Sequence, residues 1–182
     1  MKKIAKFVVG VGLWAASVIA VAEVPDALNP IIPVIESWGE NPVLVAAVIA
    51  QNEKNVSLDE IKELDAQWQA ASDLTPFMRD LMQNEAAREL VTLEQTEPYF
   101  LEVFVMDNQG ALVALTNKTS DYWQGDEAKW QKSFNNGNAA VHISDVKFDD
   151  SAAANLVQVS VAVKSEGKVI GALTVGVNVD EL

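Results

Sequence analysis

The sequence lacks several residue types, and each absence excludes a class of chemistry. It has no cysteine and only one histidine, His142. No disulfide can form, so the fold must be held together by its hydrophobic core. A lone histidine cannot build a multi-histidine metal site or a histidine dyad. Because His142 falls in a predicted strand, we expect it to have a structural or solvent-facing role.

Catalytic motifs are missing as well. The chain contains no Gly-x-Ser-x-Gly elbow, no glycine-rich phosphate loop and no Cys-x-x-Cys pair. Neighbouring acids such as Asp126 and Glu127 point in different directions, so they do not form the opposed carboxylates of a glycosidase. The turn at residues 107–110 looks like half of a calcium loop, but the later glutamate of an EF-hand is absent. We therefore expect a protein that is not an enzyme and holds no metal or cofactor.

Basic residues are scarce. The chain has 13 Lys and Arg against 26 Asp and Glu, which gives a formal net charge of -13 at pH 7. Lys2, Lys3 and Lys6 lie at the very start, so the rest of the chain is more acidic still. Such a surface repels nucleic acids and anionic membrane surfaces, and neither is expected as a partner.

Long apolar runs are absent after the N-terminus. The three early lysines precede an uncharged apolar stretch over residues 7–19, and Ala20 and Ala22 supply the small residues that a signal peptidase requires. We therefore predict a signal peptide over residues 1–22, cleavage before Glu23 and export to the periplasm without stable membrane insertion. The alternative is an uncleaved anchor, because the run approaches the length of a membrane span.

The remaining length and patterning predict a single α+β domain, since helices come first and strands follow. Residues 23–40 contain three prolines and are expected to form an irregular lead-in. The domain then covers residues 41–182, with a helical half over 41–97 and a sheet half over 98–182. Helices are expected after Asn41, Ser57 and Thr75 and over 84–93. Strands are expected over 100–106, 111–116, 140–143, 156–163 and 169–177, and a short helix over 128–134.

A polar, aromatic segment at residues 119–127 interrupts the predicted strands and is the candidate ligand loop. Flat aromatic rings beside carboxylates suit a cationic or zwitterionic ligand, such as an amine or an amino acid. A carboxylate ligand would instead need one of the nearby lysines Lys118, Lys129 and Lys164. The candidate ligand-binding residues are Thr119, Ser120, Asp121, Tyr122, Trp123, Asp126 and Trp130, with Gln158 and Ser160 of one strand as the pocket floor.

Each candidate also has a structural interpretation. Tyr122 and Trp123 can simply plug the edge of the sheet, and Asp121 can bond the amides of its own turn. Alternate residues of an antiparallel strand, such as Gln158 and Ser160, can face water. Trp68 lies on an apolar helical stripe, so we expect it to pack in the core, with Asp65 as a solvated or capping carboxylate.

Four segments of the sheet half carry a resemblance to a known family: Asp107-Asn108-Gln109-Gly110, Thr119-Ser120-Asp121-Tyr122, Gln158-Val159-Ser160-Val161 and Gly167-Lys168-Val169-Ile170-Gly171. Together they resemble a Cache domain, the extracytoplasmic PAS-like sensor domain also called PDC. The resemblance covers residues 99–182 and is looser over 36–97. It implies an antiparallel sheet of about five strands with N-terminal helices packed on it. It also implies a small-molecule pocket between the sheet and its covering segments, which falls on residues 119–130 and the inward polar residues of the central strands.

Receptors of this kind usually continue into membrane spans and a signalling module, whereas this sequence ends at Leu182. We therefore expect a stand-alone periplasmic sensor that presents a polar solute to a membrane-bound sensor or transporter. The alternative is a protein-protein interaction subunit of an envelope complex with no small ligand. An exposed apolar patch around the N-terminal helix would favour that alternative.

Overall fold

The computed structural model describes residues 26–149 and 153–182. The predicted signal peptide over residues 1–22 lies outside this part of the chain. The helices are η1 (Asp26–Leu28), α1 (Ile32–Trp38), α2 (Pro42–Glu53), α3 (Leu58–Ala70), α4 (Pro76–Gln83), α5 (Glu85–Glu94), α6 (Ala128–Phe134), η2 (Asn135–Gly137) and η3 (Val179–Glu181). The strands are β1 (Phe100–Met106), β2 (Leu112–Leu115), β3 (His142–Ile143), β4 (Lys147–Asp149), β5 (Ala154–Ser165) and β6 (Lys168–Asn178).

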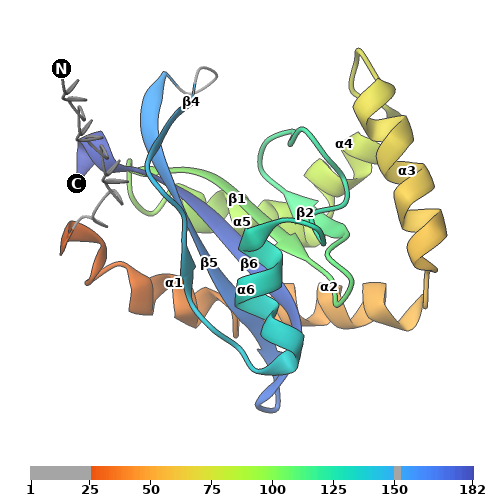
Figure 1. The fold of residues 1–182 in the computed structure, drawn as a ribbon, viewed down its shortest axis with the longest axis horizontal. Coiled ribbons are helices and arrows are strands. Elements are labelled where there is room, and N and C mark those ends of the chain that lie inside the picture. The colour runs from red at the N-terminus through yellow and green to blue at the C-terminus, as the bar shows by residue number, and fades with distance from the viewer. Residues whose placement is uncertain (1–25, 150–152) are drawn as a thin grey trace, which may run out of the picture.

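The strands form one antiparallel sheet of six strands in the order β2-β1-β6-β5-β3, with β4 also paired to β5. The long hairpin of β5 and β6 occupies its centre (Figure 1). Its turn contains Gly167 at a φ of 76°, and the turn between β1 and β2 contains Gly110 at 87°. The turn at residues 107–110 was expected from the sequence, and glycine suits both turns because a positive φ costs it little. The α+β class and the antiparallel sheet are confirmed.

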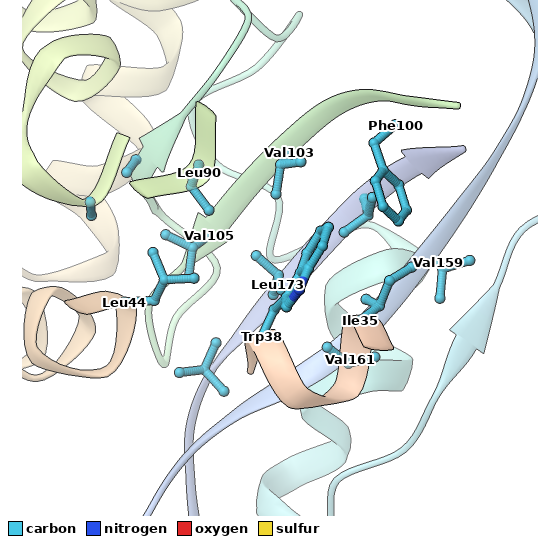
Figure 2. Close-up of a cluster of buried hydrophobic side chains, with 14 of the residues drawn as sticks. Ile35, Trp38, Leu44, Leu90, Phe100, Val103, Val105, Val159, Val161 and Leu173 are labelled. Carbon is cyan, nitrogen blue, oxygen red and sulfur yellow. The ribbon is translucent and has the colours of Figure 1, made fainter. Parts of the chain in front are cut away.

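Helices α1, α2 and α5 cover one face of the sheet, which we call the helix face. Figure 2 shows how Ile35, Trp38, Leu44 and Leu90 from these helices meet valines and leucine from β1, β5 and β6. The Trp38 ring lies 4.9 Å from the ring of Phe100 in an edge-to-face contact. The main hydrophobic core of the domain is therefore on this side of the sheet.

The lead-in predicted as irregular over residues 23–40 is wrong in part, because residues 32–38 form helix α1. Pro33 stands in the first turn of that helix, where a missing backbone N–H costs nothing. Ile35 and Trp38 are buried. The prolines predict irregular chain, but Pro33 lies in the first turn of a helix that belongs to the core.

Helix α2 is apolar nearly all round, yet only part of it is buried. Leu44 and Val48 are fully buried, whereas Ala46 and Ala50 are exposed. Only one side of the helix meets the sheet, so an open apolar groove remains between α2 and α5. Within the described residues no helix alone is long and apolar enough for a membrane span, although α1 and α2, bent by 53°, reach that composition as a pair.

Candidate functional site

The face of the sheet opposite the helix face carries polar side chains, and we call it the site face. Glu102, Phe104 and Met106 of β1 share this face because side chains alternate along a strand. Directly opposite residues on neighbouring strands also share a face. The register therefore adds Thr174 and Gly176 of β6, Gln158 and Ser160 of β5, and His142 of β3.

Two hydrogen-bonded pairs lie on this face. The hydroxyls of Ser160 and Thr174, both fully buried, are 2.9 Å apart. The Gln158 amide donates to Glu102 Oε1 across 2.9 Å, bridging over Gly176. A Cβ at position 176 would stand only 2.4 Å from Glu102 Cγ, so the glycine leaves room for this bridge. The expectation that Gln158 and Ser160 share a face is confirmed, while their role as a pocket floor remains a prediction.

Helix α6 lies over the site face, in front of β5 and β6 in Figure 1. Its Lys129 ammonium stands 5.5 Å from the centre of the Phe104 ring, and its side chain is 16% exposed. The ammonium donates to Gln124 Oε1 at 3.0 Å and pairs with Glu127 at 2.9 Å. The Lys129 ammonium is thus held over the sheet by partners from the loop that precedes α6 in the chain.

The loop before α6 is anchored to α3. Tyr122 is buried, and its ring contacts Phe77 at 5.1 Å and Trp68 at 5.9 Å. The Trp68 indole donates to the Thr119 carbonyl at 2.9 Å. Asp65 Oδ1 accepts hydrogen bonds from the backbone N–H groups of residues 122 and 123 at 2.8 and 3.0 Å. Trp68 therefore packs in the core as expected, and Asp65 caps the amides of a distant loop.

Trp123 and Trp130 both bind the turn between β1 and β2. The indole of Trp123 donates to the Gln109 carbonyl at 2.8 Å, and that of Trp130 donates to the Asp107 carbonyl at 3.0 Å. The Lys62 ammonium lies 4.8 Å over the Trp123 ring. Residues 111 and 123 also form an isolated antiparallel bridge. Trp123 thus lies at the sheet edge, as the structural interpretation predicted.

The same segment presses directly against that turn. A Cβ on Gly110 would lie 2.4 Å from the Cα of Gly125, and a Cβ on Gly125 would lie 2.4 Å from the Gln109 carbonyl oxygen. The backbone N–H of Gln124 donates to the Gly110 carbonyl at 2.8 Å. Two glycines back to back therefore allow the loop and the turn to meet without side chains between them.

The polar residues of the segment face outward or bond locally. Ser120 and Asp126 are exposed. Asp121 is half-buried and accepts from the Ser120 hydroxyl, while the Thr119 hydroxyl donates to the Asp121 carbonyl at 2.7 Å. The predicted residues thus fall into three groups: the outer loop, the aromatic anchor and the site-face floor. None of them lines any of four prominent hollows formed by residues 26–149 and 153–182.

Several residues around the site were not predicted. Glu102, Thr174 and Gln124 were missed, and Lys129 was considered only for a carboxylate ligand. A signal was present for Glu102, since it stands at an alternate position of an otherwise apolar strand. The roles of Thr174 and Gln124 depend on register and loop path, which a single sequence does not give.

Burial changes the acid-base behaviour of groups near the site. It raises the pKa of Tyr122, and the charges of Asp107 and Glu60 raise it further. Burial also raises the pKa of Asp107, against the lowering effect of the hydrogen bonds it accepts from its own turn. Beside Ser160, burial lowers the pKa of His142, and Lys132 adds to the shift while Asp145 opposes it. Tyr122 and His142 are therefore neutral at pH 7.

A comparison with known protein families identifies the family of this chain. The profile of methyl-accepting chemotaxis protein-like first PDC sensor domains matches residues 77–182, which is more than half of the sequence. The chain belongs to this family. The match of the PDC sensor domain covers the whole sheet, α5 and α6, and so the entire site face. The resemblance to Cache domains is confirmed, and the protein is a sensor domain by family. No curated protein matches the chain.

Solved structures of sensory domains are also similar to this chain, at low sequence identity. The sensory domain of the Campylobacter jejuni chemoreceptor Tlp3 is 18% identical, with a TM-score of 0.43 over 82% of this chain and 65% of that one. The ligand-binding domain of the Pseudomonas aeruginosa amino acid chemoreceptor PctC, in complex with GABA, is 12% identical with a TM-score of 0.38, over 85% and 63% of the two chains. That of Pseudomonas fluorescens CtaA with L-valine is 12% identical with a TM-score of 0.36, over 82% and 64%. The chain thus spans less than two thirds of each of these domains.

Proposed function

We propose that this PDC sensor domain works in the periplasm and binds a small zwitterionic solute, such as an amino acid, between α6 and the site face. The observation that carries the proposal is the contrast between the two faces of β5 and β6. The helix face of these strands is lined by Val157, Val159, Val161, Leu173 and Val175, all buried. The site face of the same strands carries Gln158, Ser160 and Thr174.

A face that only had to support a helix would be expected to be apolar, as the helix face is. Burying a hydroxyl or an amide is costly unless it finds a hydrogen-bond partner. The Ser160-Thr174 and Gln158-Glu102 pairs meet this requirement without a ligand. They also present hydroxyl, amide and carboxylate oxygens side by side, which supports a role in contacting a polar ligand.

Charges of both signs border this floor. Lys129 can exchange Gln124 and Glu127 for the carboxylate of a ligand, and Glu102 can accept from a ligand ammonium group. The Trp130 ring and the segment 119–127, with Thr119, Ser120, Asp121, Tyr122, Trp123 and Asp126, would serve as the cover. Ligand binding would then favour a conformation in which α6 is displaced from the floor, by shifting a population rather than by chemistry.

In this proposal, the signal peptide over residues 1–22 directs export of the protein. The exported protein then presents its bound solute to a membrane-bound sensor or transporter. Its single domain begins with α1 rather than at residue 41, because Ile35 and Trp38 lie in the core. Strong negative charge suits such a role in an aqueous compartment, since it keeps the surface soluble and away from anionic lipids.

A thermal-shift screen over amino acids, amines, carboxylates and purines tests this function. A ligand at a hundred times its Kd should add about 2.7 kcal/mol to the free energy of unfolding. Lys129→Ala should weaken binding of a zwitterion by about tenfold or more, because a charge-assisted bond is lost. The matched control is Lys132→Ala on the exposed side of α6. If no compound in a broad screen raises the Tm, the proposal fails.

A pair of floor variants separates binding from folding. Ser160→Ala alone leaves the buried Thr174 hydroxyl without its hydrogen-bond partner. This change should lower the free energy of unfolding by about 1–3 kcal/mol. Ser160→Ala combined with Thr174→Val removes both polar groups and should be nearly neutral for folding, yet it should still abolish ligand binding. Asp121→Ala with Trp123→Ala tests the cover in the same way: lost binding with an intact fold supports a ligand role, and unfolding shows a structural one.

One observation favours the interaction-subunit alternative. The groove between α2 and α5, about 460 Å³ in volume, is lined mostly by Pro42, Val43, Ala46, Ala47, Ala50 and Ala86. An exposed apolar surface of this kind is typical of a docking site. In this case Ala46→Asp would disrupt an envelope complex, detectable by cross-linking in cells, without altering any ligand-induced Tm shift.

A further inference from the structure

A second hollow lies at the hairpin end of the sheet, away from the site face. In Figure 1 this is the lower end, where α6 finishes beside the β5-β6 turn. Four separate parts of the chain line it: the end of α2, the β1-β2 turn, the region where α6 passes into η2, and the start of β6. Its volume is about 710 Å³, within the usual range for pockets that bind small molecules.

The walls of this hollow are fixed by contacts that do not involve a ligand. The Asn52 side chain donates to the Ile170 carbonyl at 2.8 Å and accepts from the Asn108 backbone N–H at 3.1 Å. It therefore ties α2 to both β6 and the β1-β2 turn. On the other side, the Phe134 ring stacks on Trp130 at 4.8 Å with an angle of 10° between the planes. Such a preformed site spares a ligand the cost of ordering it.

The lining combines three kinds of groups. Ile49, Phe134 and Val169 supply apolar surface. The side-chain amides of Asn108 and Asn136 make no hydrogen bond to other residues in the described part of the chain. The Glu53 carboxylate and the Lys168 ammonium, both exposed, are likewise unpaired within residues 26–149 and 153–182. An anion, a cation, free amides and an apolar surface therefore share one hollow.

We propose that this hollow binds a short peptide of two or three residues with free ends. A free ammonium end pairs with Glu53 and a free carboxylate end with Lys168. The peptide groups between them match the amides of Asn108 and Asn136, each of which both donates and accepts. An extended tripeptide is about 10 Å long, and its side chains rest on the apolar surface around Phe134. A single amino acid has no peptide group for the two asparagines.

The experiment uses the tripeptide Ala-Leu-Ala, followed by two-dimensional NMR of the backbone and asparagine amides. We expect saturable shifts at Asn108, Asn136, Gly137 and Lys168 at millimolar peptide, with no change at Ser160 or Thr174. Lys168→Ala and Glu53→Gln should each weaken binding about 3- to 10-fold, as expected for one partly exposed charge contact. The matched controls are Lys147→Ala on β4 and Glu63→Gln on α3, which lie outside the hollow.

Two further probes define the ligand class. Ala-Leu-Ala acetylated at its first residue and amidated at its last should bind at least several-fold more weakly, and equal binding would contradict recognition of the free ends. Leucine alone should bind more weakly than the tripeptide, and equal affinity would contradict the role of the two asparagines. Absence of saturable shifts with every probe would overturn the proposal. Since the site-face variants do not touch this hollow, failure here leaves the proposed function unaffected.

Discussion

The alternation of single residues along a strand determines which face of the sheet packs in the core and which face is polar. Along β5, Val157, Val159 and Val161 alternate with Gln158 and Ser160, so one strand contributes a valine surface to the core and a polar surface to the site face. The sequence pattern predicted this alternation. It did not show that the polar side is covered by α6 instead of facing water, because that depends on where a later segment folds back.

Glu94, near the end of α5, is a residue whose burial lowers the stability of the fold at neutral pH. Its Oε2 atom is buried without a hydrogen-bond partner among residues 26–149 and 153–182. Burial raises the pKa of this carboxyl; the contact with the Thr116 hydroxyl opposes the shift and the charge of Glu102 adds to it. The folded state thus holds the proton more tightly than the unfolded chain, and stability falls as the pH rises above the ordinary value of 4.5.

Glu94→Gln should therefore stabilise the protein at pH 7, and the gain should shrink as the pH falls towards 4.5 and be lost below it. Because the carboxyl is only half-buried, solvent screening limits the gain to about 2 °C in Tm. Thermal unfolding followed by circular dichroism across this pH range measures the effect. Glu97→Gln, at an exposed neighbouring position, is the control. A loss of stability at neutral pH in Glu94→Gln would contradict the argument.

At the scale of elements, helix starts were the most predictable feature. Asn41, Ser57 and Thr75 each cap the helix that was expected after them, and Asn84 caps the helix that was expected over 84–93. Their signals are local, since the capping side chain bonds an amide two or three residues away. The helix α1 was missed because its three nearby prolines outweighed a short apolar pattern. Strand β4 was missed because three residues are too few to show an alternation.

The candidate site was predictable only in part, and for a related reason. The segment 119–127 lies between the second strand and a short helix, as predicted, whereas its role as a cover for a ligand remains a prediction. How its aromatic rings divide between the anchor on α3 and the turn at Asp107 was not predictable. That division depends on the Asp65 carboxylate, 57 positions from Tyr122, and on the carbonyls of Gln109 and Asp107, 14 and 23 positions from the tryptophans that they bind.

Helix α3 and this loop should behave as one unit, because Asp65 accepts from both backbone amides at 122 and 123. Asp65→Ala removes two hydrogen bonds to a charged acceptor and should lower local stability by about 1.5–3 kcal/mol. Hydrogen exchange at residues 119–124 and in α3 should accelerate together, while exchange in the β5-β6 hairpin stays slow. Asp65→Asn keeps an acceptor and should have a smaller effect. Glu63→Ala is the control on the same helix, and independent exchange in the two segments would refute the coupling.

At the scale of the whole molecule, negative charge dominates. A formal charge of -13 on 182 residues makes the folded state repel itself. Raising the ionic strength from about 10 mM to about 150 mM shortens the Debye length from about 30 Å to about 8 Å. We therefore expect the Tm of the protein to rise with salt over this interval, and equally for sodium and potassium chloride. A flat or falling Tm would show that repulsion is not limiting, and a response to one cation only would indicate specific binding.

The back-to-back glycines at 110 and 125 have a consequence for how a solute reaches the floor. The loop and the β1-β2 turn touch through bare backbone there, so this border leaves no room for a solute to pass. Under the proposed function, a solute would therefore enter at the opposite border, where α6 faces β3. The entry to the proposed floor would then lie beside His142, and bulky residues placed there, not at the turn, should slow solute entry.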